Sequence, residues 1–202
     1  MILYDCAPAP NPRRTRIFLH EKGIDIPIEQ IDIMKGDHKK DNYKKMSPLS
    51  QVPTLELDDG TYITESIAIC RYFEALHPKP NLMGNDPKEI AIIEMWQRRL
   101  ELLLMQGIAN TYRHGHPSMA SLEEQIKEWA EASRPRVIKT LNWLEGEMED
   151  KKFICLDRFT IADITALVCF DFAKWPGITI PDNCNNLLSY YERLSQRPSA
   201  KA

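Results

Sequence analysis

Two short motifs in the first half of the chain carry residue types that could together bind a small peptide-like molecule. The first is Gln51-Val52-Pro53, in which a proline opens an apolar segment. Proline cannot donate to a strand ladder, so it is expected at a sheet edge or in a special turn. If the peptide bond before Pro53 is cis, that turn exposes the backbone N–H and C=O of Val52 to an extended ligand. Taken alone, the motif could equally be an ordinary turn.

The second motif is Glu65-Ser66, which follows Pro53 by twelve positions at the predicted start of a helix. The free N–H groups and the dipole at a helix N-terminus stabilise a carboxylate. The Glu65 side chain can accept an ammonium group, although the pair alone could be a simple helix start. Together the two motifs predict a receptor for a zwitterionic group attached to a peptide.

The elements that must position these motifs alternate between strand-like and helix-like patterns. Asn11-Pro12 is typical of an N-cap followed by proline at the first helical position, and Gly23 ends that helix. Asp59-Gly60 is a hairpin turn signal between two apolar segments. The expected strands are 1–4, 26–33, 52–57 and 62–63, and the expected helices are 13–22 and 66–76. This order predicts a compact α/β domain over residues 1–78.

Beyond a linker at 77–85 that is rich in Pro, Gly and Asn, the pattern changes to helices only. Asp86-Pro87 marks a helix start, and Ser121 with Glu124 fits a capping box. The segment 160–173 is almost wholly apolar, which is typical of a helix buried on all sides. The expected helices are 86–113, 121–148, 160–173 and 183–196. They predict an all-helical domain over residues 86–202.

Composition argues against several other classes of protein. The net charge is −3, which does not favour nucleic-acid binding. No apolar run reaches the ~18 residues of a membrane span, so no membrane segment is expected. The five cysteines are scattered and form no CxxC pair, which disfavours a disulfide framework and a zinc site. The start, MILYDCAPAP, lacks the charged and apolar regions of a secretion signal, so we expect a cytoplasmic protein.

On these motifs the whole chain resembles the cytosolic glutathione S-transferase superfamily, and the segment 36–55 is similar to theta-like members. The resemblance, to a theta/nu-like bacterial-type member, implies a thioredoxin-like α/β N-terminal domain and an all-α C-terminal domain. In the helical half, Thr160-Ile161-Ala162-Asp163 resembles the capping box that starts the central helix of the family. The resemblance also implies glutathione as the co-substrate and no metal.

The resemblance further implies which residues bind glutathione. The backbone of Val52 would pair with the cysteinyl part, while Glu65 and Ser66 would hold the γ-glutamyl end. His38 and Gln51 would reach the glycine carboxylate, with a solvated loop histidine as the alternative for His38. The full implied set is Ala9, Asn11, His38, Gln51, Val52, Pro53, Glu65 and Ser66.

The residue that activates the glutathione thiol departs from the usual family pattern. Family members place a Tyr, Ser or Cys after the first strand, where this chain has Ala9. Nu-type members have Thr there and Asn two positions on, so Asn11 is the catalytic candidate, with a helix cap as its alternative role. Tyr4 and Cys6 are further candidates, or else a residue packed under the site and an incidental thiol. The Arg13-Arg14 pair could favour a thiolate or simply be two exposed helix charges.

A second substrate, a small apolar electrophile or a disulfide, is expected to bind between the two domains. Because apolar residues at helical spacing are more often core, the assignment of this electrophile pocket rests on position alone. His114 and His116 resemble a metal pair only superficially, and a loop is the simpler interpretation. The candidate pocket residues are Met105, Ile108, Tyr112 and Trp175.

The implied function is a glutathione-dependent transferase with a role in detoxification. The thiolate of glutathione would attack electrophiles or reduce disulfides and hydroperoxides. The alternatives are a protein of this fold that binds glutathione or apolar ligands with little turnover, and a regulatory partner similar to the stringent-starvation relatives. The resemblance also implies a homodimer, because family members bury a seam between the small domain of one chain and the long helices of the other. Glu94, Arg98 and Arg99 give indirect support, since they put charge on a long helix that could pair across a two-fold axis.

Overall fold

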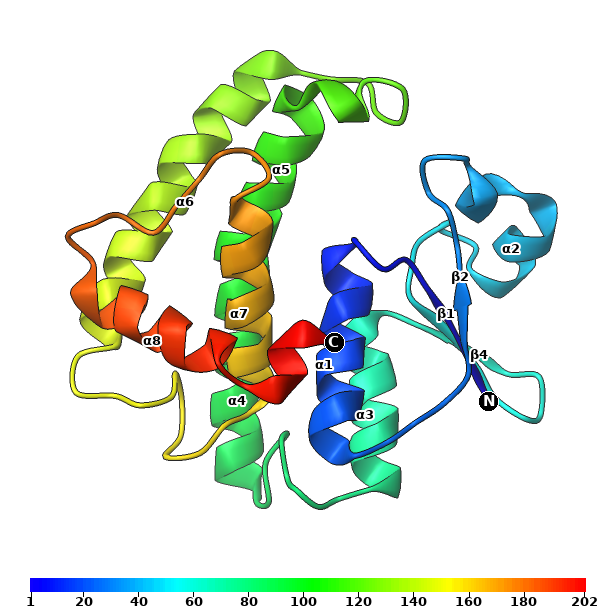
Figure 1. Cartoon of the computed structure of the whole chain (residues 1–202), viewed down its shortest axis with the longest axis horizontal. Coiled ribbons are helices and arrows are strands. Elements are labelled where there is room, and N and C mark those ends of the chain that lie inside the picture. Colours follow the sequence, from blue (N-terminus) through cyan, green and yellow to red (C-terminus); the bar gives the residue numbers. More distant parts are fainter. The chain divides into compact units, whose positions relative to one another are not determined.

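The computed structural model describes all 202 residues and divides them into two compact units, each shown in Figure 1. Unit 1 contains Met1–Leu82 together with Pro198–Ala202, and unit 2 contains Met83–Arg197. Unit 1 combines a sheet with helices, whereas unit 2 is entirely helical. These are the two architectures expected from the sequence, although the last five residues belong to the α/β unit.

Unit 1 is built on a four-stranded sheet with the order β2-β1-β3-β4. Strand β1 pairs in parallel with β2 and antiparallel with β3, which pairs antiparallel with β4. Strands β2 and β3 are shorter than expected, because Pro27 and Pro53 directly precede them and cannot donate to the ladder. The strands are β1 (Ile2–Asp5), β2 (Ile28–Gln30), β3 (Thr54–Glu56) and β4 (Tyr62–Thr64).

The register of this sheet brings four chain segments to one edge. Tyr4 lies opposite Thr54, Thr54 lies opposite Thr64, and Asp5 lies opposite Gln30. The carboxyl ends of β1, β2 and β4 therefore lie at the same edge as the amino end of β3. The loops that follow β1, β2 and β4 and the loop that precedes β3 all start from this edge.

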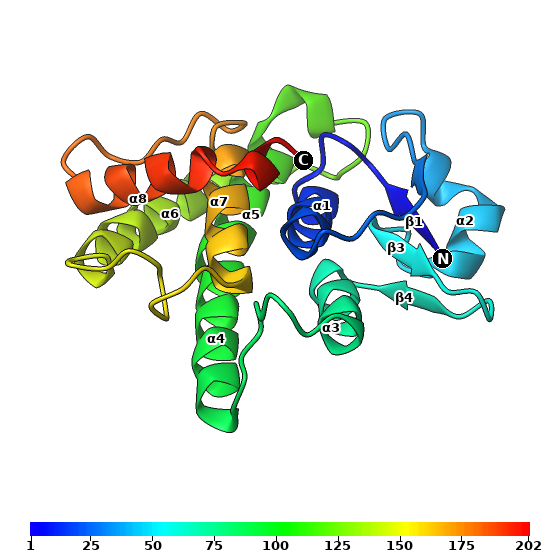
Figure 2. The ribbon, with the colours of Figure 1, turned by 60° about the horizontal axis from the view of Figure 1, so that its bottom comes forward.

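The helices of unit 1 cover both faces of the sheet. Helices α1 (Pro10–Lys22) and α3 (Ser66–Leu76) lie side by side on one face, and α2 (Asp41–Met46) lies on the other (Figures 1 and 2). A 3₁₀ turn at Pro198–Lys201 packs against α1 and completes the unit.

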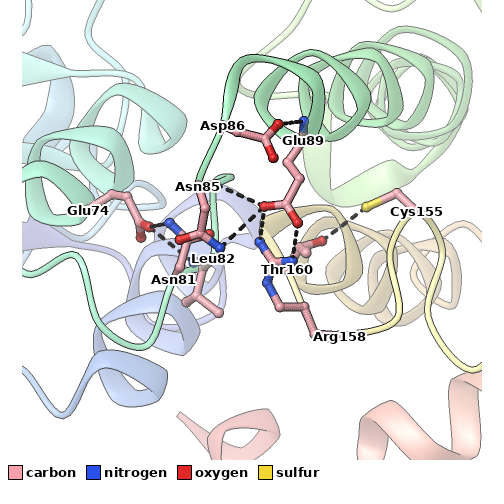
Figure 3. A network of polar contacts seen from close by, with 9 residues as sticks. All are labelled: Glu74, Asn81, Leu82, Asn85, Asp86, Glu89, Cys155, Arg158 and Thr160. Carbon is pink, nitrogen blue, oxygen red and sulfur yellow. Dashed lines mark hydrogen bonds and ion pairs between the residues drawn. The ribbon is translucent and has the colours of Figure 1, made fainter.

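A buried ion pair between α1 and α3 holds the segment that follows α3 in place. Lys22 lies 2.5 Å from the carboxylate of Glu74 and also donates to the C=O of His77 at 2.7 Å. Glu74 in turn accepts from the Asn81 side chain at 2.9 Å and from the backbone N–H of Leu82 at 3.1 Å (Figure 3). The carboxylate thus positions the segment that leaves α3.

Unit 2 begins with one long helical run, visible in Figure 2 from α4 to α5. Asp86 caps its start by accepting from the backbone N–H of Glu89 at 2.9 Å, as the Asp-Pro pair predicts. The run consists of α4 (Pro87–Arg99), a π-helical stretch (Leu100–Met105) and α5 (Gln106–Gly115). The remaining helices are α6 (Lys127–Glu147), α7 (Ile161–Ala173) and α8 (Asn185–Ser195).

The expected helix start at Ser121 and Glu124 is wrong, because α6 begins only at Lys127. The side-chain amide of Gln125 donates to the C=O of Arg113 and of His116, both at 2.8 Å. These bonds fold the segment before α6 back onto the end of α5, so the capping-box residues lie in turns.

The buried helix α7 starts with the expected capping box, which the structure confirms. Asp163 accepts from the backbone N–H of Thr160 at 2.8 Å and from that of Ile154 at 2.9 Å. The hydroxyl of Tyr190 in α8 donates to the same carboxylate at 2.7 Å. One buried carboxylate therefore joins α7, α8 and the loop before α7.

In unit 2, an ion pair joins the start of α4 to that same loop before α7 (Figure 3). Both terminal nitrogens of Arg158 donate to Glu89, at 2.7 and 2.6 Å. The hydrogen bonds from Arg158 lower the pKa of Glu89 to about 2. A carboxyl with a lowered pKa stabilises the fold above its unfolded pKa and loses that effect as the pH falls through its folded pKa.

We expect Glu89→Gln to lower the melting temperature at pH 7, because it removes the bidentate charged pair with Arg158. The difference in melting temperature between the variant and the parent should narrow as the pH falls from about 4.5 towards about 2, where Glu89 becomes protonated. This difference is measured by thermal unfolding, followed by circular dichroism, across this pH range. Glu147→Gln, at an exposed pair 3.6 Å from Lys151, is the matched control and should change little. A difference independent of pH would contradict this account.

Candidate glutathione site

The sheet edge described above gathers most of the expected ligand-binding residues within unit 1. Val52 and Pro53 lie just before β3, Glu65 follows β4, and Ala9 lies in the loop between β1 and α1. His38 lies in the 3₁₀ turn Asp37–Lys39, after β2. The motifs around Pro53 and Glu65, which are separate in the sequence, thus lie at one edge of the same sheet.

The peptide bond between Val52 and Pro53 is cis, which confirms the expectation from the sequence. The backbone of the preceding residue, Gln51, is held on both sides. Its N–H donates to the hydroxyl of Ser47 at 3.1 Å, and its C=O accepts from Ser47 at 3.0 Å and from Tyr43 at 2.8 Å. The backbone N–H and C=O of Val52 make no hydrogen bond within the protein. A fixed segment therefore presents an unpaired backbone edge at Val52.

Helix α3 starts at Ser66, and Glu65 occupies the position before it with a φ of 69°. A positive φ is uncommon for a residue with a side chain and is often found at ligand sites. The Glu65 side chain is exposed and does not cap the helix. The first α-helical bond of this turn runs from the N–H of Ile69 to the C=O of Glu65, which leaves the earlier N–H groups without helical partners. An exposed carboxylate and free N–H groups thus lie side by side.

The sequence did not indicate the role of Arg14. Its side chain is only 1% exposed, and one terminal nitrogen lies 3.4 Å from the hydroxyl of Ser66. The interpretation of two exposed charges is therefore wrong for Arg14, while Arg13 donates to the C=O of Ala200 at 2.9 Å. The available signal was spacing, because Arg14 shares the buried helix face of Ile17 and Phe18.

His38 is only 9% exposed, so the alternative of a solvated loop histidine is wrong. Its Nδ1 has no hydrogen-bond partner in the protein. Burial, and to a lesser extent the charge of Lys39, lowers the pKa of His38. The ring is therefore neutral at pH 7 and can offer a hydrogen bond rather than a full charge. The side chain of Gln51, the other residue expected at the glycine end of the ligand, is exposed.

Helix α1 begins earlier than expected, which changes the role of Asn11. The helix starts at Pro10, Ala9 occupies the N-cap position, and Asn11 is the second helical residue rather than the cap. Prolines fit the first turn because its N–H groups lack helical partners anyway. Pro10 and Pro12 have no N–H, and the N–H of Arg13 bonds to the C=O of Ala9 at 3.2 Å. The N–H of Asn11 is therefore the free donor of this first turn.

Tyr4 and Cys6 are poorly placed to activate a thiol. The Tyr4 hydroxyl donates to Glu56 at 2.7 Å, and this bond together with burial raises the pKa of Tyr4 far above its usual value. Tyr4 packs in a small cluster with Ile31 and Tyr43, as expected for a residue beneath the site. Burial raises the pKa of the Cys6 thiol, which opposes a reactive thiolate.

The four candidate residues for the electrophile divide into two pairs within unit 2. Ile108 is fully buried and belongs to the helical core, so its assignment to a pocket is wrong, and Met105 is also buried. The rings of Tyr112 and Trp175 lie 5.2 Å apart, and both pack against Phe172. Trp175 is 40% exposed, so this aromatic cluster has an accessible side.

The two histidines near the end of α5 are engaged in local hydrogen bonds. The Nδ1 of His116 lies 2.7 Å from the hydroxyl of Ser118, and the Nδ1 of His114 accepts from the N–H of Ile126 at 3.2 Å. No group of three or more His, Cys, Asp or Glu side chains is arranged to hold a metal ion. None of the helices combines the length and apolar character needed to cross a membrane.

Comparison with known proteins agrees with both units. The family model described as the glutathione S-transferase N-terminal domain matches residues 9–76, and the model of the C-terminal domain matches residues 103–198. Glutathione S-transferase 2 of Saccharomyces cerevisiae is 35% identical over 205 residues, covering 100% of this chain and 88% of the relative. GstA of Escherichia coli O157:H7, also a glutathione S-transferase, is 27% identical, covering 93% of this chain and 89% of the relative.

Solved structures give the same answer at the level of the fold. The crystal structure of Gtt2 from Saccharomyces cerevisiae has a TM-score of 0.95 and 35% identity, covering 100% of this chain and 99% of that chain. A Gtt2-class glutathione S-transferase of Vibrio parahaemolyticus has a TM-score of 0.88 and 30% identity, covering 100% and 96%. Both units match the family models, and relatives of 30–35% identity are covered over 88–99% of their length, so the chain belongs to the glutathione S-transferase family.

Proposed function

We propose that this glutathione-dependent transferase binds glutathione along the sheet edge of unit 1. The observation that carries the proposal is the unpaired backbone of Val52, which has the geometry to accept one peptide unit of an extended ligand. The exposed carboxylate of Glu65 would receive the γ-glutamyl ammonium, and Ser66 with the free N–H groups of α3 would receive its carboxylate. His38 and Gln51 would hold the glycine end.

The thiol would be activated at the start of α1. Hydrogen-bond donors and the positive end of a helix stabilise a thiolate over a thiol. Asn11 is exposed there and can offer both its backbone N–H and its side-chain amide, while Ala9 offers no hydroxyl. The thiolate then forms a bond from sulfur to an electrophilic carbon as the leaving group departs with its electron pair. With a disulfide, it attacks one sulfur and expels the other as a thiolate.

The co-substrate is assigned by class. We propose small apolar electrophiles, disulfides or hydroperoxides, with Tyr112 and Trp175 of unit 2 as contacts for an apolar group. Aromatic faces bind such groups by burial and stacking. The absence of a hydroxyl at Ala9 favours disulfide or peroxide reduction over conjugation, and it is also the observation that supports the alternative of a glutathione-binding protein with little turnover.

Glu65→Ala should weaken glutathione binding by about ten- to a hundredfold, because a charge-assisted hydrogen bond contributes about 1.5–3 kcal/mol. Glu65→Gln should lie between the parent and the alanine variant, since it keeps the length of the side chain without its charge. Titration calorimetry with glutathione measures both. Asp25→Ala, at an exposed carboxylate after α1, is the control and should bind as the parent does. Unchanged affinity in both Glu65 variants would exclude this placement of the γ-glutamyl group.

Asn11→Ala should lower kcat/KM for glutathione by about ten- to a hundredfold at pH 6.5 if the side-chain amide holds the thiolate. Asn11→Asp should be at least as slow, because an ionised carboxylate cannot donate and repels the thiolate. The aspartate is favourable near a helix N-terminus, so the melting temperature should not fall. The assays use a chlorinated nitroarene, cumene hydroperoxide and hydroxyethyl disulfide.

Two outcomes of these assays would redirect the assignment. If both Asn11 variants match the parent from pH 6 to 8, the side-chain amide is not the activator and the backbone N–H remains. If the parent binds glutathione but turns over none of the three substrates, the binding alternative holds.

We also propose a homodimer. Leu102 and Leu103 are large apolar side chains that remain well exposed on the long helical run, and the exposed ion pair of Glu94 and Arg98 lies one turn before them. Such a surface suits a self-complementary two-fold interface. Sedimentation at micromolar concentration should give roughly 47 kDa, twice the 23.4 kDa of the chain. A single species of monomer mass would contradict the proposal.

A further inference from the structure

The carboxylate of Asp5, at the end of β1, is a buried charge that has no role in the proposed site. This side chain is completely buried. One of its oxygens accepts from the Arg16 guanidinium of α1 at 2.6 Å, and the other accepts from the Gln30 side-chain amide of β2 at 2.8 Å. Burying a carboxylate costs free energy unless its partners are well placed, so the placement of the two partners of Asp5 matters.

The two partners of Asp5 both continue to the same peptide, that of Ala7. The second terminal nitrogen of Arg16 donates to the C=O of Ala7 at 2.7 Å. The side-chain oxygen of Gln30 accepts from the N–H of Ala7 at 2.9 Å. Ala7 is exposed and has no side chain that could anchor it. Asp5, Arg16 and Gln30 therefore form a clamp, named here the Asp5 clamp, which grips one loop peptide from both sides.

The gripped peptide directly precedes the start of α1. The N–H of Ala9 donates to the C=O of Cys6 at 2.8 Å, so residues 6–9 form a single turn around Ala7 and Pro8. Ala9 is the N-cap residue of α1, and Asn11 carries the free N–H of the first helical turn. Because the prolines at 8, 10 and 12 stiffen this stretch, a displacement of Ala7 is passed on to Asn11.

We propose that Arg16 and Gln30, bridged by Asp5, are positioning residues that hold the first turn of α1 at the sulfur of glutathione. The inference rests on the proposed function, in which this turn stabilises the thiolate. The clamp acts through the backbone and touches no substrate atom. The exposed Ala and Pro residues of the loop before α1 cannot anchor it by burying their side chains. The hydrogen bonds of the clamp fix the position of this loop instead.

The first test is Arg16→Lys, which keeps the charge but has a single nitrogen in place of the planar fork. One ammonium cannot keep both the bond to Asp5 and the bond to the C=O of Ala7 in this geometry. A less well-held thiolate should lower kcat/KM for glutathione by about three- to tenfold at pH 6.5 and by less than about twofold at pH 9, where the thiol ionises without help. Binding of S-methylglutathione, which has no thiol, should change by less than about twofold. Arg136→Lys, an exposed change in unit 2, is the control.

The second test exchanges donor and acceptor within the clamp. Asp5→Asn puts an amide against the amide of Gln30, so one hydrogen bond is lost whichever way either group turns. Gln30→Glu puts two carboxylates against each other. In the double variant the new amide at position 5 can accept from Arg16 and donate to the new carboxylate at position 30, which still accepts from Ala7. Each single change should lower kcat/KM at pH 6.5 about three- to tenfold, and the double variant should recover to within about twofold of the parent.

Two results would overturn the inference. In the first, the Arg16 and Gln30 variants melt at lower temperature, but their kcat/KM depends on pH as that of the parent does. That result would mean that the clamp only stabilises the fold. In the second, the double variant is no better than the single ones. Failure of the proposed function looks different, because the parent itself would then not bind S-methylglutathione or would not turn over. Arg16→Lys and Gln30→Glu leave Asp5 in place, so the test stands even if Asp5→Asn does not fold.

Discussion

The proposed site depends above all on the register of the four-stranded sheet. Leu3 and Leu55 lie opposite each other and are both completely buried. A slip of one residue would turn an entire strand face from the core to solvent, so burial of these side chains fixes the register. The same register sets Tyr4, Thr54 and Thr64 in one row, and through them the loops that carry Ala9, Val52 and Glu65. The register that buries the core side chains is thus the same one that brings the loops of the proposed site together.

In the proposed site, much of the ligand recognition comes from backbone groups and the side chains around them hold these groups in place. Tyr43 and Ser47 fix the peptide before Val52, and Arg14 fixes the hydroxyl of Ser66 at the start of α3. The Asp5 clamp does the same for the loop before α1. Such an arrangement tolerates change in the side chains that face the ligand, provided that the buried supports remain. This division is compatible with the proposed site having an alanine at position 9, where the family resemblance implies a hydroxyl or a thiol.

Features with a local cause could be predicted from the sequence. The alternation of strands and helices, the start of α3, the cap at Asp86 and the box at Thr160 all depend on residues close together in the chain. The two errors at helix starts also have local features behind them. At Asn11 a second proline, Pro10, moved the helix start upstream, and near Ser121 the side chain of Gln125 holds the chain in turns.

The rest required contacts between distant residues. Arg14 meets Ser66 across fifty-two positions, and Asp5 meets Gln30 across twenty-five. Helical spacing places Arg14 on the same face as Ile17 and Phe18, but it does not identify the partner that a buried charge meets on another element. His38 is a similar case, since a histidine in a polar, lysine-rich segment gives no local sign of burial.

The return of residues 198–202 to unit 1 has a consequence for the order of events during translation. Arg13 and Glu21 of α1 contact Ala200 and Ser199, and Ser199 is almost completely buried. All of unit 2, from Met83 to Arg197, is synthesised between these partners. At ~5–20 residues per second, the ribosome needs roughly 6–23 s for that stretch. The nascent α/β half therefore waits with one side of α1 uncovered, and it is completed only after the helical half has left the ribosome.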